Sequence, residues 1–538
     1  MLRAVVAVLA VSFLYVRVSM SRGSQFTFSQ VPSADIPRST FNRTHNYKTT
    51  FNSGILIPFY VDEALPGDTF NLRVNAFARL STPIVPIMDN MYMDMFFFAV
   101  PNRLVWDNWQ KFMGEQDNPG DSIDYTVPVL TVPIPGFTPN SIYDYMGLPV
   151  LSGFGGLPAP SALPLRAYNL IYNQWFRDQN LQPSVAVPKG DGPDTHQTYS
   201  LLRRGKRHDY FTSCLPWPQK GPGVEIPIGG VVPIEAGVSS PTWRQSGETI
   251  NHRLRGTAGG AAVTLSPNAI DSSDLTWWST GLTVQGGTIN DLRQAFQIQR
   301  LLERDARGGT RYVEILKSHF RVDSPDARLQ RPEYLGGGSV PVVIHSVAQT
   351  SGSPTTPSTI EETPQANLSA IGLVSSHGNG FTKSFVEHSI IIGLVMVRAD
   401  LSYQGGVNRM WVRRTRYDFY WPALAHLGEQ PVYQYELDVA SASGAVFGYQ
   451  ERWAEYRYHP SLITGQFRSN VPGSLDYWHL AQALTNPVLN AAFIEENPPV
   501  DRVVAVPDEP EWLFDSHFMV KCARPMPLYS VPGMADHF

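Results

Sequence analysis

The fold is decided by the stretch Phe70-Asn71-Leu72-Arg73-Val74-Asn75-Ala76-Phe77-Ala78-Arg79-Leu80, in which apolar and polar residues alternate. A period of two places one row of side chains on each face of a β-strand, so this stretch predicts a strand with one face toward a core. The run from Met91 to Val100 repeats the pattern. Pro83 and Pro86 predict a loop between the two strands.

Further strands are predicted from Val340 to Gln349 and from His388 to Arg398, where a nearly continuous apolar run indicates a strand covered on both faces. Helical spacing predicts one helix from Leu163 to Asp178 and another that starts at Thr288 and ends at Gly308-Gly309. Early and late strands with two helices and long segments between them predict a mainly β fold. We expect an antiparallel jelly-roll β-sandwich with long loop insertions and a few helices.

The composition favours a subunit that associates. Of 538 residues, 43% are hydrophobic and only 17% are charged, below the roughly 25% usual for a soluble chain. Association is one way to bury the apolar surface that so few charges leave uncovered. The net charge of -5 provides no general basic field, so any contact with nucleic acid must be local.

Segments without periodicity flank the predicted sandwich. Residues 20–50 form a predicted N-terminal arm, which is polar and without periodicity from Ser24 to Thr50. Residues 51–538 form one predicted jelly-roll domain, in which the stretch from Gly221 to Gly287 is an insertion rich in Gly, Ser, Thr and Pro. The segment from Pro472 to Phe538 is punctuated by prolines but keeps aromatic residues, which predicts an ordered C-terminal arm.

Residues 1–19 are a predicted N-terminal extension with two interpretations. Arg3 followed by the apolar run from Ala4 to Val16 resembles the core of a signal peptide. The same residues also fit a reading frame extended upstream of a true start at Met20, in which case they are not part of the native chain.

Motifs for catalysis are missing from the sequence. No nucleophile elbow, phosphate-binding loop, dinucleotide fingerprint or zinc-protease motif is present, and the 13 histidines show no ligand spacing. Acidic pairs such as Asp62-Glu63 are adjacent, so on a strand they point to opposite faces. We therefore expect no enzyme activity, no catalytic residues, no metal ligands and no cofactor. Cys214 and Cys522 are expected to be reduced, partly buried thiols.

Two basic clusters allow two interpretations. One spans Arg203 to His208, and the other combines Arg409, Arg413, Arg414 and Arg416 with nearby aromatic residues. Guanidinium groups pair with phosphates while aromatic rings stack on unpaired bases, so either cluster can hold single-stranded nucleic acid. Ion pairs and aromatic stacks inside an oligomer interface are the alternative, and they are favoured because interfaces are enriched in the same residues.

Several long segments resemble the major capsid protein of gokushoviruses, small single-stranded DNA phages of the Microviridae. The resemblance covers about Ser21 to Phe538. The segments that carry it include Ile57-Pro58-Phe59-Tyr60-Val61-Asp62-Glu63-Ala64-Leu65-Pro66-Gly67-Asp68-Thr69, Thr212-Ser213-Cys214-Leu215-Pro216-Trp217-Pro218-Gln219-Lys220 and Arg328-Leu329-Gln330-Arg331-Pro332-Glu333-Tyr334-Leu335-Gly336-Gly337.

This resemblance implies an eight-stranded jelly roll and one copy per asymmetric unit of a T=1 icosahedral shell around a circular single-stranded DNA genome. It implies a virion protein that assembles in the host cytoplasm and does not contact a membrane. The implied partners are further copies of the chain, the genome, other virion and scaffolding proteins, and a bacterial surface receptor. The resemblance is poor over about Val224 to Leu282, where the family has a variable surface protrusion. Residues 1–19 also depart from the family pattern, which favours the extended reading frame.

The resemblance gives roles to the candidate residues. We expect the inward, DNA-facing cations to be Arg38, Arg43, Lys48, Arg413, Arg414 and Arg416. Trp243, Trp277 and Trp278 of the insertion are candidates for receptor contact, and packing within the insertion is the favoured alternative. A different function also stays open: a secreted β-sandwich that binds or cleaves carbohydrate, in which these tryptophans stack on sugars.

Overall fold

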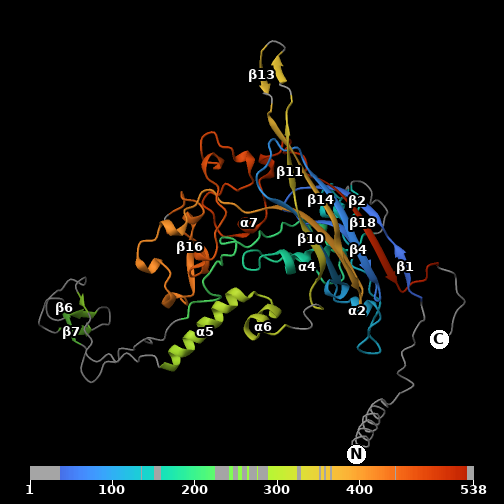
Figure 1. Ribbon diagram of the computed structural model, residues 1–538. Helices are drawn as coiled ribbons and strands as arrows, with labels where there is room; N and C mark the ends of the chain where they lie inside the picture. Colours follow the sequence, from blue (N-terminus) through green and yellow to red (C-terminus); the bar gives the residue numbers. More distant parts are fainter. Residues whose placement is uncertain are drawn as a thin grey trace, which may run out of the picture.

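Two antiparallel sheets packed face to face form the body of the molecule (Figure 1). The computed structural model describes residues 37–134, 136–150, 159–224, 289–323, 329–350, 366–442 and 444–529, together with the backbone of residues 242–245, 252–256, 263–265, 275–276, 353–356 and 359–363. The first sheet contains β1 (Ser39–Asn42), β2 (His45–Phe51), β18 (Trp512–Arg524), β4 (Thr69–Leu80), β14 (Leu368–Ser384) and β11 (Val343–Ala348). The second contains β10 (Glu333–Pro341), β5 (Met91–Pro101), β15 (Ser389–Ala399) and β3 (Ile57–Ala64). The prediction of a mainly β, antiparallel sandwich is confirmed.

The core between the sheets follows from the alternation of residues along the strands. One row of β4, from Phe70 to Leu80, is buried, and the other row points outward. β18 pairs with β4 along its whole length and buries Trp512, Phe514 and Phe518 in the same core. The predicted strands over residues 70–80 and 91–100 are thus confirmed within one residue at their ends.

The second sheet is covered on both faces. All 11 residues of β15 are buried, and they alternate between the core of the sandwich and a second apolar cluster beneath α4 (Leu163–Ile171). α4 continues as one turn of π-helix, η3 (Tyr172–Phe176), so the predicted helix is confirmed as far as Phe176. Leu130, Phe137, Ile142 and Tyr143, which precede α4 in the sequence, also join this second cluster and help to cover the sheet.

Two long insertions interrupt the strands. The first, between β5 and β10, holds η2 (Asn102–Leu104), α2 (Trp109–Phe112), α3 (Ile142–Tyr145), α4, η3, η4 (His196–Thr198), β6 (Thr242–Gln245), β7 (His252–Gly256), β8 (Val263–Leu265), β9 (Leu275–Thr276), α5 (Ile289–Gly308) and α6 (Tyr312–Phe320). The second, between β15 and β18, holds η7 (Arg409–Trp411), η8 (Arg416–Asp418), η9 (Pro422–Leu424), β16 (Glu429–Tyr433), η10 (Gln434–Glu436), β17 (Val446–Glu451), η11 (Ala454–Tyr456), η12 (Gly465–Phe467), η13 (Asp476–Trp478), α7 (Ala491–Ile494) and η14 (Val500–Arg502). A short hairpin, β12 (Ser353–Thr356) and β13 (Thr359–Thr363), joins β11 to β14.

The structure corrects both predicted arms. Residues 39–51 of the N-terminal arm form β1 and β2, which pair with β18 of the same chain. Trp512–Arg524 of the predicted C-terminal arm is β18 itself, a strand inside the first sheet. The arm prediction is therefore wrong for these two segments, because each one has a strand partner far away in the sequence. Residues 1–36 and 530–538 lie outside the described residues.

Both thiols are buried and free. Cys214 packs in a third apolar cluster beside Tyr210 and Phe447, and Cys522 packs in the core of the sandwich. The prediction of two reduced thiols is confirmed, with deeper burial than expected.

Candidate functional site

The buried carboxyl groups of the subunit include Glu436 and Glu496. Burial is the main cause that raises the pKa of Glu436 and of Glu496. The carboxylate of Glu436 accepts a hydrogen bond from the Tyr210 hydroxyl at 3.0 Å. The cavity that Glu496 lines has a volume of about 30 Å³, which holds a water molecule and no substrate. Both carboxyl groups are therefore assigned a structural role within the subunit.

Among the described residues, no group of three or more His, Cys, Asp or Glu side chains lies close enough together to hold a metal ion. Within the same part of the chain, no helix combines the length and the apolar character needed to cross a membrane.

Arg203, Arg204 and Lys206 of the first basic cluster are used inside the subunit, whereas Arg207 and His208 are exposed. The guanidinium group of Arg204 donates to Asp94 at 2.9 Å and lies 5.3 Å from the centre of the Phe96 ring. The Lys206 ammonium donates to the Phe493 carbonyl at 2.6 Å, and burial lowers the pKa of this lysine. These contacts are the predicted ion pairs and stacks, but they form within one chain. The cluster anchors the first insertion to the second sheet.

The three arm cations lie along β1 and β2. Arg38 donates to the Thr69 hydroxyl at 3.1 Å, and Arg43 makes a two-pronged ion pair with Asp62 at 2.6 and 2.9 Å. Lys48 pairs with Asp515 of β18 at 2.8 Å and keeps 72% of its side chain exposed. Arg38 and Arg43 therefore tie the first strand to its neighbours, while Lys48 presents its charge to the solvent.

The second set of predicted cations lies in the second insertion. Arg413 pairs with Glu455 at 3.4 Å and lies 4.3 Å from the centre of the Tyr456 ring, with 11% of its side chain exposed. Arg414 and Arg416 are exposed. Arg409, at the start of the same segment, donates to the Pro431 carbonyl of β16. Figure 1 places β16 at the opposite end of the molecule from β1, so the cations of the second insertion lie far from those of the N-terminal arm.

Exposed aromatic rings surround this second set of cations. We call the segment from Arg409 to Trp421 the aromatic loop. Its exposed apolar side chains are Met410, Trp411, Tyr417, Phe419, Tyr420 and Trp421, with exposed fractions from 48% for Tyr420 to 72% for Trp411. Soluble monomers rarely expose so many neighbouring apolar groups, so this loop has the character of a protein interface.

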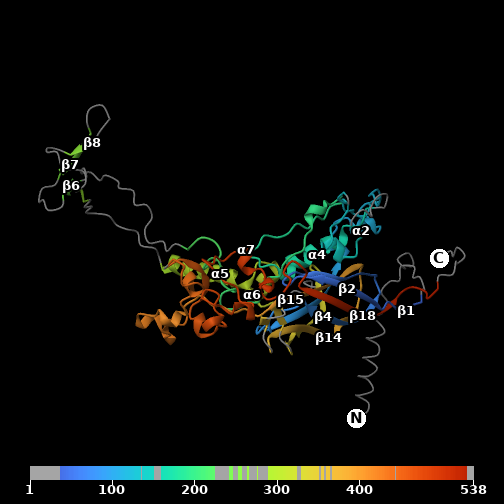
Figure 2. The same cartoon turned by 90° about the horizontal axis from the view of Figure 1, so that it is seen from above.

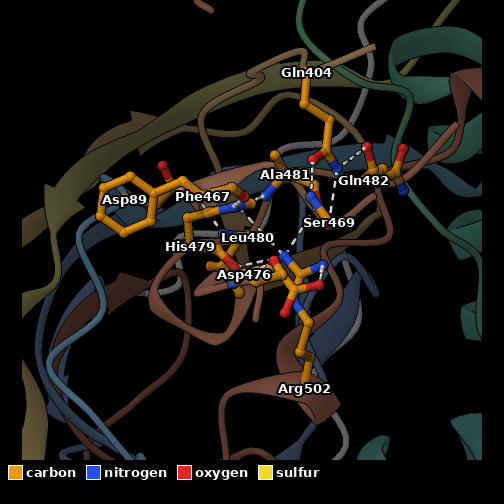
Figure 3. Close-up of polar contacts among 11 residues, drawn as sticks. Asp89, Gln404, Phe467, Ser469, Asp476, His479, Leu480, Ala481, Gln482 and Arg502 are labelled. Atoms are coloured by element: carbon orange, nitrogen blue, oxygen red, sulfur yellow. Dashed lines mark hydrogen bonds and ion pairs between the residues drawn. The ribbon is translucent and has the colours of Figure 1, made fainter. Parts of the chain in front are cut away.

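A polar network holds the second insertion against the sandwich (Figure 3). Arg502 donates to the carbonyl oxygens of His479 at 2.6 Å and of Ala481 at 3.0 Å. The buried His479 ring contacts the Phe467 carbonyl through Nε2 at 2.6 Å, and its Nδ1 accepts from the backbone N–H of Ala481 at 3.1 Å. Asp89, in the loop between β4 and β5, accepts from the backbone N–H of Leu480. The insertion is therefore a fixed part of the subunit and can present the aromatic loop in one position.

Comparison with known proteins decides the identity of this chain. The profile of a family described as "Capsid protein (F protein)" matches residues 29–534. The chain is a member of this phage capsid protein family. The capsid protein VP1 of Bdellovibrio phage phiMH2K is 48% identical to it, with 96% of this chain and 99% of that protein covered. The VP1 proteins of Chlamydia phage 1 and Spiroplasma virus 4 are 43% and 36% identical, each with 94% of this chain and 97% of the relative covered.

The resemblance to gokushovirus capsid proteins is thereby confirmed, and the chain is a capsid protein and a virion component. The comparisons give no support to the alternative of a secreted carbohydrate-binding or carbohydrate-cleaving protein. The tryptophans proposed for receptor contact are not placed: Trp277 and Trp278 lie outside the described residues, and for Trp243 only the backbone in β6 is described.

One surface of the capsid protein escaped the sequence analysis. The outward row of β4 contains Arg73, Phe77 and Arg79, all exposed. The alternation that predicted β4 also indicates that these residues point away from the core. Only the pairing of β4 with β18 and β14 shows which other side chains share its face.

Proposed function

We propose that this chain is the major subunit of a T=1 icosahedral shell that encloses a circular single-stranded DNA genome. The observation that carries the proposal is the strand order. β2-β18-β4-β14 in one sheet and β10-β5-β15-β3 in the other is the order expected of an eight-stranded jelly roll, a fold common among viral capsid proteins. In this proposal the chain forms one jelly-roll domain with insertions, and β1 and β2 belong to its first sheet.

The first proposed partner of the chain is a further copy of itself. The aromatic loop exposes apolar groups of the kind that subunit interfaces bury, and the second insertion holds it on a fixed support. The chain then acts as a structural protein with no catalytic role. Other virion and scaffolding proteins complete the assembly.

The chain is also proposed to contact the genome and the host. Among the cations proposed from the sequence, Arg38, Lys48, Arg414 and Arg416 are exposed, whereas Arg43 and Arg413 are half-buried and pair with Asp62 and Glu455. The insertion at about residues 224–282, with Trp243, Trp277 and Trp278, is the proposed outward protrusion that contacts a bacterial receptor.

Expression of the chain with its assembly partners tests the proposal. Electron microscopy should show uniform closed particles with icosahedral symmetry, and nuclease treatment should leave a protected circular single-stranded DNA. A chain that stays monomeric under these conditions, or particles of variable size, would overturn the proposal.

A further inference from the structure

The first sheet has one face on the core and one face that the described residues leave uncovered. Figure 2 shows β4, β14 and β18 on the side of the molecule away from α2 and α4. We call this uncovered surface the outer sheet face. The side chains on it include Asn71, Arg73, Asn75, Phe77 and Arg79 from β4, Leu513, Asp515, His517, Met519 and Lys521 from β18, and Asn46 and Lys48 from β2.

Strand pairing brings these rows together. Arg79 lies opposite Leu513, Phe77 opposite Asp515, and Asn71 opposite Lys521. Lys48 of β2 flanks Asp515 on its other side. The outer sheet face is therefore a continuous surface built from strands that lie more than 400 residues apart in the sequence.

The charges on this face are unbalanced. It carries four cations, Lys48, Arg73, Arg79 and Lys521, and one carboxylate, Asp515, which pairs with Lys48. Within the described part of the chain, no carboxylate forms an ion pair with Arg73, Arg79 or Lys521. The whole chain has a net charge of -5, so this concentration of unpaired positive charge is a local feature. An anionic partner complements it.

The uncharged groups on this face indicate what kind of anion fits. The Phe77 ring is 48% exposed and stands between Arg73 and Arg79 on the same strand. An exposed ring between cations can stack on an unpaired base while the cations pair with the flanking phosphates. Exposed and half-exposed amide and imidazole groups, from Asn71, Asn75 and His517, add donors and acceptors for base edges. A duplex, whose bases are already stacked, offers no place for the ring.

We propose that the outer sheet face is a contact surface for the packaged single-stranded DNA, in which Arg73, Arg79 and Lys521 pair with phosphates and Phe77 stacks on a base. This inference rests on the proposed function. The outward row of β4 from Asn71 to Arg79 extends over roughly 27 Å, enough for several nucleotides of an extended strand. The surface lies on the paired strands of the sheet, so it presents its charges at fixed spacing.

A charge-neutralising variant with a matched control tests the surface. In R73Q/R79Q/K521Q the affinity of the purified subunit for a mixed-sequence single-stranded 30-mer should fall on the order of 100-fold at 0.1 M salt, and the slope of log affinity against log salt should shrink by about 2. F77A alone should weaken binding on the order of tenfold with little change in slope. R293Q/R300Q/R304Q, which removes three exposed arginines from α5, should bind like the unmodified chain.

The particles separate this proposal from the proposed function. Shells of R73Q/R79Q/K521Q should form and contain less DNA than shells of the α5 control. If these shells form and contain a normal amount of DNA, the outer sheet face proposal is overturned and the proposed function stands. If the unmodified chain forms no closed shells, the proposed function itself fails.

Crosslinking tests the same surface without any substitution. Ultraviolet irradiation of filled, unmodified particles, followed by mass spectrometry, should yield nucleotide-bearing peptides from β4 or β18. Crosslinks confined to the aromatic loop would overturn the proposal, as would protein-to-protein crosslinks at the outer sheet face in place of DNA, which would assign the face to a second copy or a scaffolding protein.

Discussion

Arg398 of β15 donates a hydrogen bond from Nε to the carboxylate of Asp94 in β5 at 3.0 Å, and exposed fractions of 2% and 5% show that both side chains are buried. Arg204 of the first insertion donates to the same carboxylate oxygen at 2.9 Å. One carboxylate thus balances two guanidinium groups, so it joins the two central strands of the second sheet to an insertion more than 100 residues away.

The shared carboxylate makes Asp94→Asn a severe substitution. It removes the counter-charge of Arg204 and leaves the buried Arg398 with Asp400 as its remaining carboxylate. Breaking a buried pair from one side costs about 3–5 kcal/mol. We expect the free energy of unfolding to fall by that amount in urea denaturation of the purified subunit. Glu451→Gln, which breaks the exposed pair with Arg457, should cost about 0–1 kcal/mol. Equal losses in the two variants would contradict this assignment.

Burial of Glu511 makes stability depend on pH. Its carboxylate accepts from the backbone N–H of Ser53 at 2.8 Å, and burial raises its pKa above the usual 4.5. The folded chain therefore holds this proton more tightly than the unfolded chain does. The stability that the proton provides is complete below about pH 4.5 and is lost as the pH rises through the folded-state pKa.

Glu511→Gln should consequently be more stable than the unmodified chain at pH 7, and the difference should vanish below about pH 4.5. Melting temperatures measured between pH 4 and pH 8 check this. The exposed neighbour Glu509, changed to Gln, removes the same charge from the surface and is the matched control. If the stability difference between Glu511→Gln and the unmodified chain grew as the pH fell, the predicted direction of the pH dependence would be wrong.

Gly393 of β15 leaves no room for a side chain. A Cβ atom there would lie 2.8 Å from the Phe97 ring and 2.9 Å from the Cβ of Tyr60. Gly393→Ala should therefore overpack the core and cost about 1–3 kcal/mol of unfolding free energy. Gly120→Ala, where a Cβ would meet nothing within 4 Å, should be neutral or slightly stabilising in the same denaturation experiment.

The aromatic loop can be tested through assembly. Trp411 is 72% exposed, so Trp411→Ala should change the unfolding free energy of the subunit by no more than about 0.5 kcal/mol. The yield of closed particles, measured by sedimentation and electron microscopy, should fall several-fold if the ring is buried between subunits. Val386→Ala, at a position 82% exposed and away from the loop, should assemble normally. Normal assembly of the Trp411 variant would show that this ring does not contribute to the interface between subunits.

The strands with clear patterns were predictable from sequence. β4 and β5 follow their alternation, and β15 follows its apolar run, because burial on one or both faces leaves a direct mark on the order of residues. β18 has the same alternation over Trp512–Arg524, but prolines on both sides led to its interpretation as an arm. Those prolines mark the ends of a strand, and the alternation between them was the better guide.

The surfaces were less predictable than the strands. Arg204 and Lys206 belong to a run of basic residues that resembles a nucleic-acid binding site. Their partners in the structure are Asp94 and the Phe493 carbonyl, which lie far away in the sequence and are brought close by folding. Arg73 and Lys521 appear unrelated in sequence, yet pairing of β4 with β18 puts both on the outer sheet face. Sequence order fixes the face of each residue on its own strand, but strand pairing fixes its neighbours.

The position of β18 also constrains how the chain is made. β18 lies between β2 and β4, and the contact between Lys48 and Asp515 joins residues 467 positions apart. During synthesis the ribosome must release almost the whole polypeptide before β2 can find its partner, so the first sheet closes only after translation of Arg524. A product that stops before Trp512 lacks the strand that bridges β2 and β4. In such a product β2 has no neighbouring strand to pair with, and the first sheet stays incomplete.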